Sequence, residues 1–210
     1  SDTGRSAPFD TAEVRWFADV DIPPALVQLF CDAVPGVHLE VRDDSYCVTG
    51  SDEVGLKRRN GGPIEIKERL ASGGGALQLP GGISAAIEDW RKESGVDPAE
   101  IGDDDRWVEV TKVVMTRTYT LDGRGVIRTD QDLALPGCDV ELASIVVGDR
   151  QAWTFALEAW GPETGRRELL SLALGAYLEE TPFPKEFART LEHAMGYPEW
   201  LANSVEPNLG

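Results

Sequence analysis

The sequence predicts an α+β protein that consists mainly of strands, with helices inserted into the sheet region and appended after it. Segments in which apolar and polar residues alternate recur along the chain and give about eight to ten strands. Glycine and proline are frequent, at 22 and 13 of 210 residues, as is typical of a fold with many turns. After Gly161-Pro162 the spacing of apolar residues becomes helical, which completes the α+β pattern.

The composition is that of an acidic globular protein. Charged residues make up 27% of the chain, hydrophobic residues 41%, and the formal net charge is −17. This charge disfavours binding to nucleic acid or to an anionic membrane, because phosphate groups would be repelled. No apolar run reaches the roughly 20 residues of a membrane span, and no signal peptide is visible. The three cysteines form no disulfide framework or zinc pattern, so we expect a cytoplasmic protein.

The strands are predicted from alternation, because every second side chain of a strand lies on the same face. The turn Asn60-Gly61-Gly62-Pro63 indicates a hairpin, since Asn and Gly adopt positive φ at little cost, and Asp122-Gly123 indicates a second one. In order, the predicted strands are 13–18, 37–42, 46–49 after a turn at 43–45, two strands within 55–70, 107–121, 125–129, 138–147 and 152–160.

The helices are predicted from apolar residues three and four positions apart, as in Ile83, Ile87 and Trp90. The glycine-rich residues 71–82 predict a loop, which lacks the Lys-Ser/Thr of a phosphate-binding loop. One domain is expected over 9–202, with flexible termini at 1–8 and 203–210. The predicted helices are the one between Pro24 and Pro35, 83–94, 167–180 and 185–195, with a further turn at 97–100, a solvated acidic turn at 103–105 and a packed anchor at 197–201.

Charged side chains recur with period two on several strands. Lys57 and Arg59 share a face of one hairpin strand, and Glu65, Lys67 and Arg69 share a face of the other. Taken alone, this hairpin fits an exposed ribbon with weak ion pairs. If the sheet closes into a barrel of about eight strands, however, these faces line one interior. The residues that would join them there are Glu13, Arg15, Lys112, Asp139, Glu141 and Glu158.

Such an interior suits a polyphosphate ligand. Lysine and arginine neutralise phosphate oxygens, and arginine can do so with two parallel hydrogen bonds. Carboxylates would hold one or two Mg²⁺ or Mn²⁺ ions that polarise a phosphoryl group and position water.

The order of these residues resembles the CYTH superfamily, also called triphosphate tunnel enzymes, which is named for class IV adenylate cyclases and thiamine triphosphatases. The resemblance implies an eight-stranded antiparallel tunnel, with peripheral and C-terminal helices, that binds a triphosphate and acts on it with a divalent metal. The matching segments are Glu13-Val14-Arg15, 55–59, 64–69, 140–142, 157–159 and Tyr197-Pro198-Glu199-Trp200-Leu201.

The resemblance and the charge pattern together assign candidate roles. The ligand would be a small anion such as a triphosphate or a nucleotide, and a homodimer stays open. The candidate catalytic residues are Glu13 and Arg15; the substrate-binding residues are Lys57, Arg59, Lys67, Arg69 and Lys112; and the metal ligands are Glu65, Glu141 and Glu158, for Mg²⁺ or Mn²⁺.

Several positions depart from the family pattern. The opening Glu-x-Glu-x-Lys is Glu13-x-Arg15-x-Phe17 here, and the late Glu-x-Glu is Ala156-x-Glu158. Acids expected beside the metal are therefore missing. Two functions stay open: a metal-dependent phosphohydrolase or lyase, and a tunnel repurposed for ligand binding or for a different reaction. A third, an interaction protein with an acidic exterior, has no specific feature in its favour.

Overall fold

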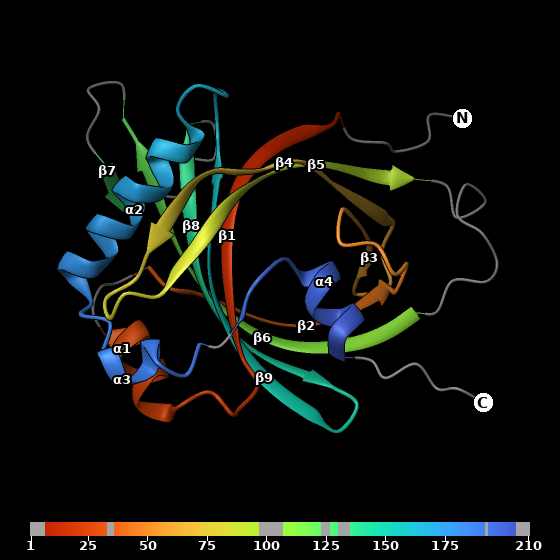
Figure 1. The fold of residues 1–210 in the computed structure, drawn as a ribbon, viewed down its shortest axis with the longest axis horizontal. Helices are drawn as coiled ribbons and strands as arrows, with labels where there is room; N and C mark the ends of the chain where they lie inside the picture. The colour runs from red at the N-terminus through yellow and green to blue at the C-terminus, as the bar shows by residue number, and fades with distance from the viewer. Residues whose placement is uncertain are drawn as a thin grey trace.

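The computed structural model describes residues 7–32, 36–96, 107–122, 127–129, 135–191 and 193–204. Within them, eight antiparallel strands form the wall of a barrel (Figure 1). The wall strands are β1 (Phe9–Ala18), β2 (His38–Cys47), β3 (Val54–Arg59), β4 (Ile64–Gln78), β5 (Ser84–Val96), β6 (Trp107–Leu121), β8 (Gly137–Val147) and β9 (Arg150–Trp160).

The barrel closes between its first and last wall strands. The strand order is β1-β5-β4-β3-β2-β6-β8-β9, and β9 pairs back onto β1 from Thr11↔Trp160 to Ala18↔Trp153. Two short strands, β7 (Ile127–Thr129) and β10 (His193–Ala194), pair with β6 and β1. The predicted α+β class and the eight-stranded antiparallel barrel are therefore confirmed.

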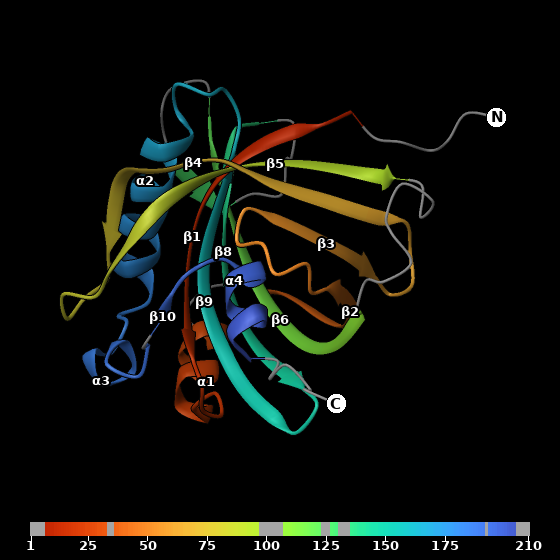
Figure 2. The same cartoon turned by 45° about the vertical axis from the view of Figure 1, so that its right-hand side comes forward.

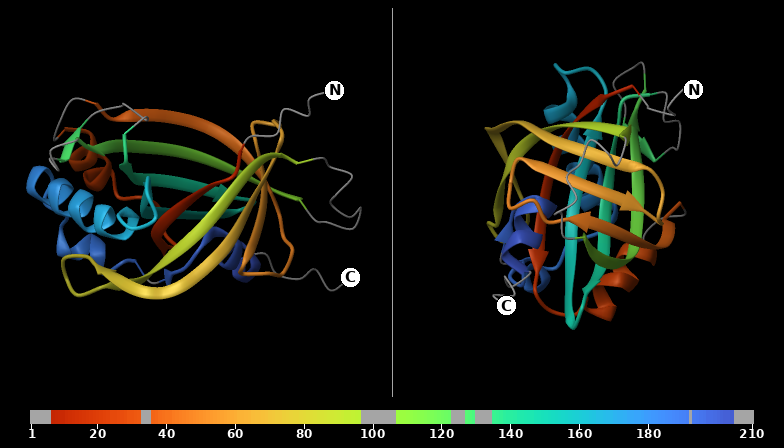
Figure 3. Two further views of the ribbon diagram at one scale, coloured as in Figure 1. Left: turned by 90° about the horizontal axis from the view of Figure 1, so that it is seen from above. Right: turned by 90° about the vertical axis from the view of Figure 1, so that its right-hand side faces the viewer.

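The main apolar core lies on the outer face of β1, β8 and β9. The helix α2 (Arg166–Glu180) packs against these strands (Figure 3). Alternation along the strands produces this arrangement. On β1, for example, Val14 and Trp16 are buried in the outer core, whereas Glu13 and Arg15 lie on the inner face. The wall thus has an apolar outer face, and charged side chains lie on its inner face.

A second apolar cluster closes one end of the barrel. It gathers Phe17, Tyr46, Val110 and other inner-face residues with Trp200 and Leu201 of α4 (Tyr197–Ser204). The rings of Phe17 and Trp200 stack with centroids 4.8 Å apart and planes 4° from parallel. Figure 2 shows α4 within the curve of the wall, so the predicted anchor at 197–201 fills the barrel end.

Two shorter helices complete the described part, α1 (Pro24–Asp32) and α3 (Lys185–Ala188). None of the described helices has the length and apolar character needed to cross a membrane. The expected turns at 97–100 and 103–105, residues 123–126 of the predicted hairpin, and most of the two expected flexible ends (1–6 and 205–210) lie outside the described residues.

The turn predicted at 43–45 is wrong, because β2 continues through it. Asp44 points inward and is fully buried, whereas its neighbours bond to the adjacent strand β6. Thr111 Oγ1 donates to Asp43 at 2.7 Å, and Ser45 Oγ donates to Glu109 at 2.6 Å. These cross-strand bonds hold polar residues, which ordinarily favour turns, in an extended strand.

The loop predicted at 71–82 and the helix predicted at 83–94 are also wrong, since both segments belong mainly to the long β4–β5 hairpin. The buried face of β5 changes along the strand: Ala85 and Ile87 join the outer core, whereas Trp90 points inward against Lys67. This change of buried face places apolar residues at spacings that imitate a helix. The glycines of β4 allow close approach, since a Cβ on Gly74 would lie 1.3 Å from Arg167 Nη1.

The helix predicted at 185–195 is too long. α3 ends at Ala188, and the chain then turns so that β10 can pair with β1, with Ala194 opposite Trp16. The buried Leu191 lies between them and anchors the connection in the outer core. Apolar residues at helical spacing therefore come from a short helix followed by a packed connection.

Candidate functional site

The inner faces of the strands enclose a cavity of about 500 Å³. Its lining is rich in charge. The exposed side chains of Phe9 and Arg59 are part of the lining, so the cavity reaches the surface of the protein. Seven cationic side chains line it, from β1 through β6: Arg15, Arg42, Lys57, Arg59, Lys67, Lys92 and Lys112.

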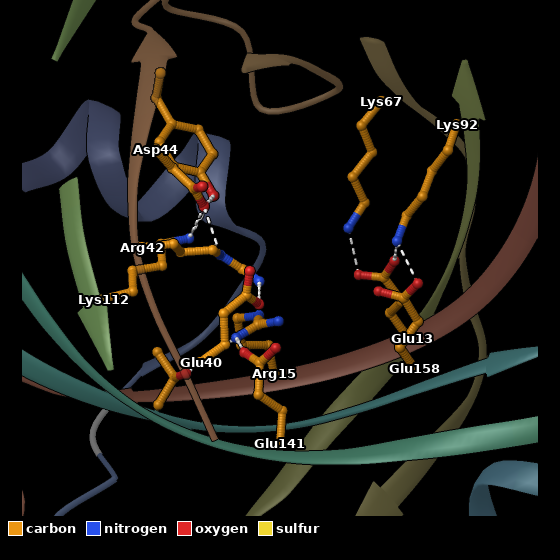
Figure 4. A network of polar contacts seen from close by, with 12 residues as sticks. Glu13, Arg15, Glu40, Arg42, Asp44, Lys67, Lys92, Lys112, Glu141 and Glu158 are labelled. Atoms are coloured by element: carbon orange, nitrogen blue, oxygen red, sulfur yellow. Dashed lines mark hydrogen bonds and ion pairs between the residues drawn. The ribbon is translucent and has the colours of Figure 1, made fainter. Parts of the chain in front are cut away.

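The first charged group in the barrel is centred on Glu13, which is 5% exposed. Lys92 Nζ lies 2.9 Å from Glu13 Oε1, Lys67 bonds to Oε2, and Thr11 Oγ1 donates to Oε1 at 2.9 Å. Lys92 also bonds to Glu158 (Figure 4). Burial opposes ionisation of Glu13, but the two ammonium groups outweigh it and hold its pKa well below the usual range.

Glu13 belongs to a row of four acids on adjacent strands. Glu88 on β5 pairs with Glu13 on β1, which pairs with Glu158 on β9, which pairs with Asp139 on β8. Like charges directly opposite one another are destabilising unless cations separate them. Lys67 and Lys92 are the cations that bond to Glu13 and Glu158. Arg69 is the cation at Glu88, with Arg69 Nη1 2.7 Å from Glu88 Oε1.

Asp139 is the acid of this row with the weakest compensation. Thr118 Oγ1 donates a hydrogen bond to Asp139 Oδ1 at 2.6 Å. Burial, together with the nearby charges of Glu158 and Glu141, raises the pKa of Asp139 to about 6. Asp139 can therefore change its protonation state near neutral pH.

The second charged group is the pair Arg15–Glu141. Arg15 Nη1 lies 2.8 Å from Glu141 Oε1 and donates to Thr154 Oγ1 at 3.0 Å. Its guanidinium also lies 4.7 Å from the centre of the Tyr197 ring. Burial disfavours the charge of Glu141, but Arg15 outweighs it and lowers the pKa of Glu141 to about 2. The pair is therefore ionised across the neutral range.

The third charged group surrounds Lys112, which is 2% exposed. Its Nζ lies 3.1 Å from Asp44 Oδ2, bonds to the hydroxyl of Tyr46, and lies 3.8 Å from the centre of the Tyr197 ring. Arg42 Nε also bonds to Asp44, at 3.3 Å. Burial lowers the pKa of Lys112 well below the usual lysine value, even with these partners.

The sequence pattern predicts that the charged residues of the β3–β4 hairpin all face the interior together, but they do not all line the cavity. Lys57 and Glu65 line the cavity and pair with each other, with Lys57 Nζ 3.0 Å from Glu65 Oε2. Arg59 also lines the cavity but is exposed. Arg69 does not line it, because its guanidinium bonds to Glu88 and, at 2.5 Å, to Asp52. The structure thus places all five predicted substrate-binding cations on the inner face, and four of them at the cavity.

The three predicted metal ligands do not converge. Glu65 pairs with Lys57, Glu141 with Arg15, and Glu158 with Lys92. Among the described residues, no group of three or more His, Cys, Asp or Glu side chains could hold a metal ion. Mg²⁺ and Mn²⁺ prefer several oxygen ligands around one position, so the donors present here do not fit either ion.

Several residues of the site were not predicted from the sequence. Lys92 was missed because its segment resembles a helix, and Asp44 because it lies in an expected turn. Asp139 was expected on the interior face beside Glu141 from the alternation of β8, and it lines the cavity, although no role was assigned to it. Arg42 and Tyr197 also line the cavity. Arg42 carries the same period-two signal, because it and Glu40 alternate with Leu39 and Val41 along β2.

Comparison with known proteins gives limited similarity. No protein-family model matches the chain, and no curated protein matches it. One similar solved structure is HpAC1 from Hippeastrum, described as a proposed adenylyl cyclase with a dominant triphosphatase activity. The two chains are 15% identical; the match covers 86% of this chain and 94% of HpAC1, with a TM-score of 0.38. Another is the Pct1 RNA triphosphatase of S. pombe, 12% identical over 87% and 80%, with a TM-score of 0.39.

These values are too low for an argument about function. The described strands nevertheless close into an eight-stranded antiparallel barrel, which is the architecture that the resemblance implies.

Proposed function

We propose that this barrel binds a small polyanion, of the class of a triphosphate or a nucleotide, in its interior. One observation carries the proposal: seven cationic and five acidic side chains line one cavity, which gives it an excess of cations in a protein whose net charge is −17. A random distribution of cations over such an acidic protein would place most of them beside surface acids. The cavity volume of about 500 Å³ lies within the roughly 300–1,000 Å³ typical of small-molecule sites.

The electrostatics of the lysines support an anionic ligand. Burial lowers the pKa of Lys57 and of Lys112, and it lowers the pKa of Lys67 to about 8, despite a carboxylate beside each of them. The acids of the barrel therefore do not fully offset the cost of burying these ammonium groups. A phosphate oxygen near Lys57 or Lys67 would supply the missing stabilisation through charge-assisted hydrogen bonds.

Binding would exchange ion pairs rather than fill an unoccupied cationic pocket. Lys67 can turn from Glu13 toward a ligand, because Glu13 keeps its second partner, Lys92. Arg59 is exposed at the cavity and offers a planar donor to a phosphate group. Arg15 is less available, since Glu141 and Thr154 hold its guanidinium.

Of the two functions that the sequence leaves open, we propose binding without metal-dependent hydrolysis. The support is the pairing of every predicted metal ligand with a cation of the protein, which leaves no described donor set suited to Mg²⁺ or Mn²⁺. We therefore assign Glu13 and Arg15 to positioning the charged groups of the cavity.

Isothermal titration calorimetry with tripolyphosphate in EDTA tests the proposal. We expect binding by the wild-type protein and affinity at least about tenfold weaker for Lys67→Met, which removes one charge-assisted contact. Arg91→Met is the matched control, because Arg91 is an exposed cation paired with Asp10 outside the cavity. Absence of binding at millimolar ligand, or equal affinity of wild type and Lys67→Met, would show that the cavity is not the site.

A further inference from the structure

We infer that Lys92 is a built-in replacement for a divalent metal ion: its ammonium group bridges Glu13 and Glu158, where two carboxylates of the barrel would otherwise share a metal. This goes beyond the proposed function and does not depend on it, since it concerns the charge balance of the protein without a ligand.

The contacts of Lys92 are those of a bridging cation. Its Nζ lies 2.9 Å from Glu13 Oε1 on β1 and bonds to Glu158 Oε1 on β9. These two acids are directly paired across neighbouring strands, so one cation between them satisfies both (Figure 4). The side chain of Lys92 is 20% exposed and that of Glu13 is 7% exposed, so little water separates the charges.

The count of charges also matches a divalent ion. Lys67 and Lys92 lie directly opposite each other on β4 and β5, and Lys67 bonds to the second oxygen of Glu13. Two ammonium groups opposite each other would repel without an acid between them. Together they supply two positive charges against the two negative charges of Glu13 and Glu158, as one Mg²⁺ or Mn²⁺ would.

The strand that carries Lys92 makes this possible. β5 lies between β1 and β4 in the wall, so an inner-face lysine at position 92 reaches the acids of β1 and β9 from the neighbouring strand. Arg15 has a comparable role at Glu141, because it bonds to this carboxylate from two strands away along the inner wall. Fixed cations therefore accompany the inner acids at two separate places.

Removing Lys92 should create the metal site that Lys92 replaces. We expect Lys92→Met to bind one Mn²⁺, at least about tenfold tighter than wild type, because Glu13 and Glu158 lose their shared cation while Asp139 lies beside them. Loss of the electron paramagnetic resonance signal of free Mn²⁺ measures this binding. Lys92→Met combined with Glu158→Gln is the matched control, and it should lose the gained site.

Three outcomes would overturn the inference: stoichiometric Mn²⁺ binding by wild type, a folded Lys92→Met that binds no better than wild type, or a gained site that survives Glu158→Gln. Lys92→Gln is the second variant if Lys92→Met does not fold. If neither variant folds, wild type decides: paramagnetic broadening of the Lys92 side-chain NMR signal at equimolar Mn²⁺ overturns the inference, and an unbroadened signal supports it. None of these measurements uses a polyphosphate, so they fail or succeed independently of the proposed function.

Discussion

Arg15 on β1 reaches past Ala156 on β9 to the carboxylate of Glu141 on β8, with Arg15 Nη1 2.8 Å from Glu141 Oε1. Ala156 is directly opposite both residues, and its methyl group leaves the space that the guanidinium crosses. Two departures from the family pattern, at positions 15 and 156, are thus coupled in space. A long acidic side chain at 156 would stand in the path of Arg15.

Glu141→Gln should destabilise the protein by about 3 kcal/mol, because it leaves the guanidinium of Arg15 buried without a counter-charge. Urea unfolding at pH 7 measures the change. Arg15→Met combined with Glu141→Gln should recover much of the loss, since no unpaired charge then remains. Because the pKa of Glu141 is lowered from 4.5 to about 2, the pair stabilises wild type above pH 4.5 and loses this effect as the pH falls toward 2. A Glu141→Gln variant as stable as wild type would contradict the pairing.

Asp139→Asn should stabilise the protein at neutral pH. The pKa of Asp139 is raised from 3.8 to about 6. Ionised Asp139 therefore lowers the free energy of unfolding; this loss is absent below pH 3.8 and grows until the pH passes 6. We expect the variant to be more stable than wild type by about 2 kcal/mol at pH 7 and equal to it at pH 3.5. Thermal unfolding across this range tests the expectation, with Asp149→Asn in the exposed β8–β9 turn as control. Parallel pH curves for wild type and Asp139→Asn would refute it.

Tripolyphosphate binding should weaken as Lys67 loses its proton. The pKa of Lys67 in the free protein is about 8, and a bound phosphate would raise it, so binding near pH 8 should take up a proton. Relative to Lys67→Met, which reports the ligand's own titration, we expect the wild-type affinity to fall about tenfold between pH 7 and pH 9. Calorimetry in buffers of different ionisation enthalpy measures the proton uptake. Equal pH dependence in the two proteins would remove Lys67 from the site.

Two changes in α4 should have opposite effects on stability. The hydroxyl of Tyr197 is buried and has no described hydrogen-bond partner, so Tyr197→Phe should be neutral or stabilising by up to about 1 kcal/mol. Trp200→Ala should destabilise by about 3–5 kcal/mol, because it removes the ring stacked on Phe17. Melting temperatures compare the two variants. A loss in Tyr197→Phe similar to that in Trp200→Ala would show that the hydroxyl makes a stabilising bond.

Strands with one apolar and one charged face could be predicted from the sequence. On β1 the alternation places Val14 and Trp16 in the outer core and Glu13 and Arg15 inside, as the structure confirms. β8 and β9 follow the same rule. Their pattern is informative because the barrel wall separates an apolar exterior layer from a charged interior.

The pairing of charges could not be predicted, because it depends on how the barrel closes. Arg15 and Glu141 are 126 residues apart in the chain, and they meet only because β9 pairs with both β1 and β8. Lys92 was hidden for a different reason, since a strand whose buried face changes along its length loses its simple alternation. Most of the interior charges were therefore visible in the sequence, whereas the pairs that they form were not.

The pairing of Lys67 with Glu13 has a consequence for selectivity. Any ligand anion must compete for Lys67 with a carboxylate that is attached to the same protein and therefore always present at high effective concentration. A monovalent anion offers one contact and loses this competition. A ligand with several linked charges can displace several carboxylates in one binding event, so the interior acids favour polyvalent anions over chloride or acetate without any filter for size.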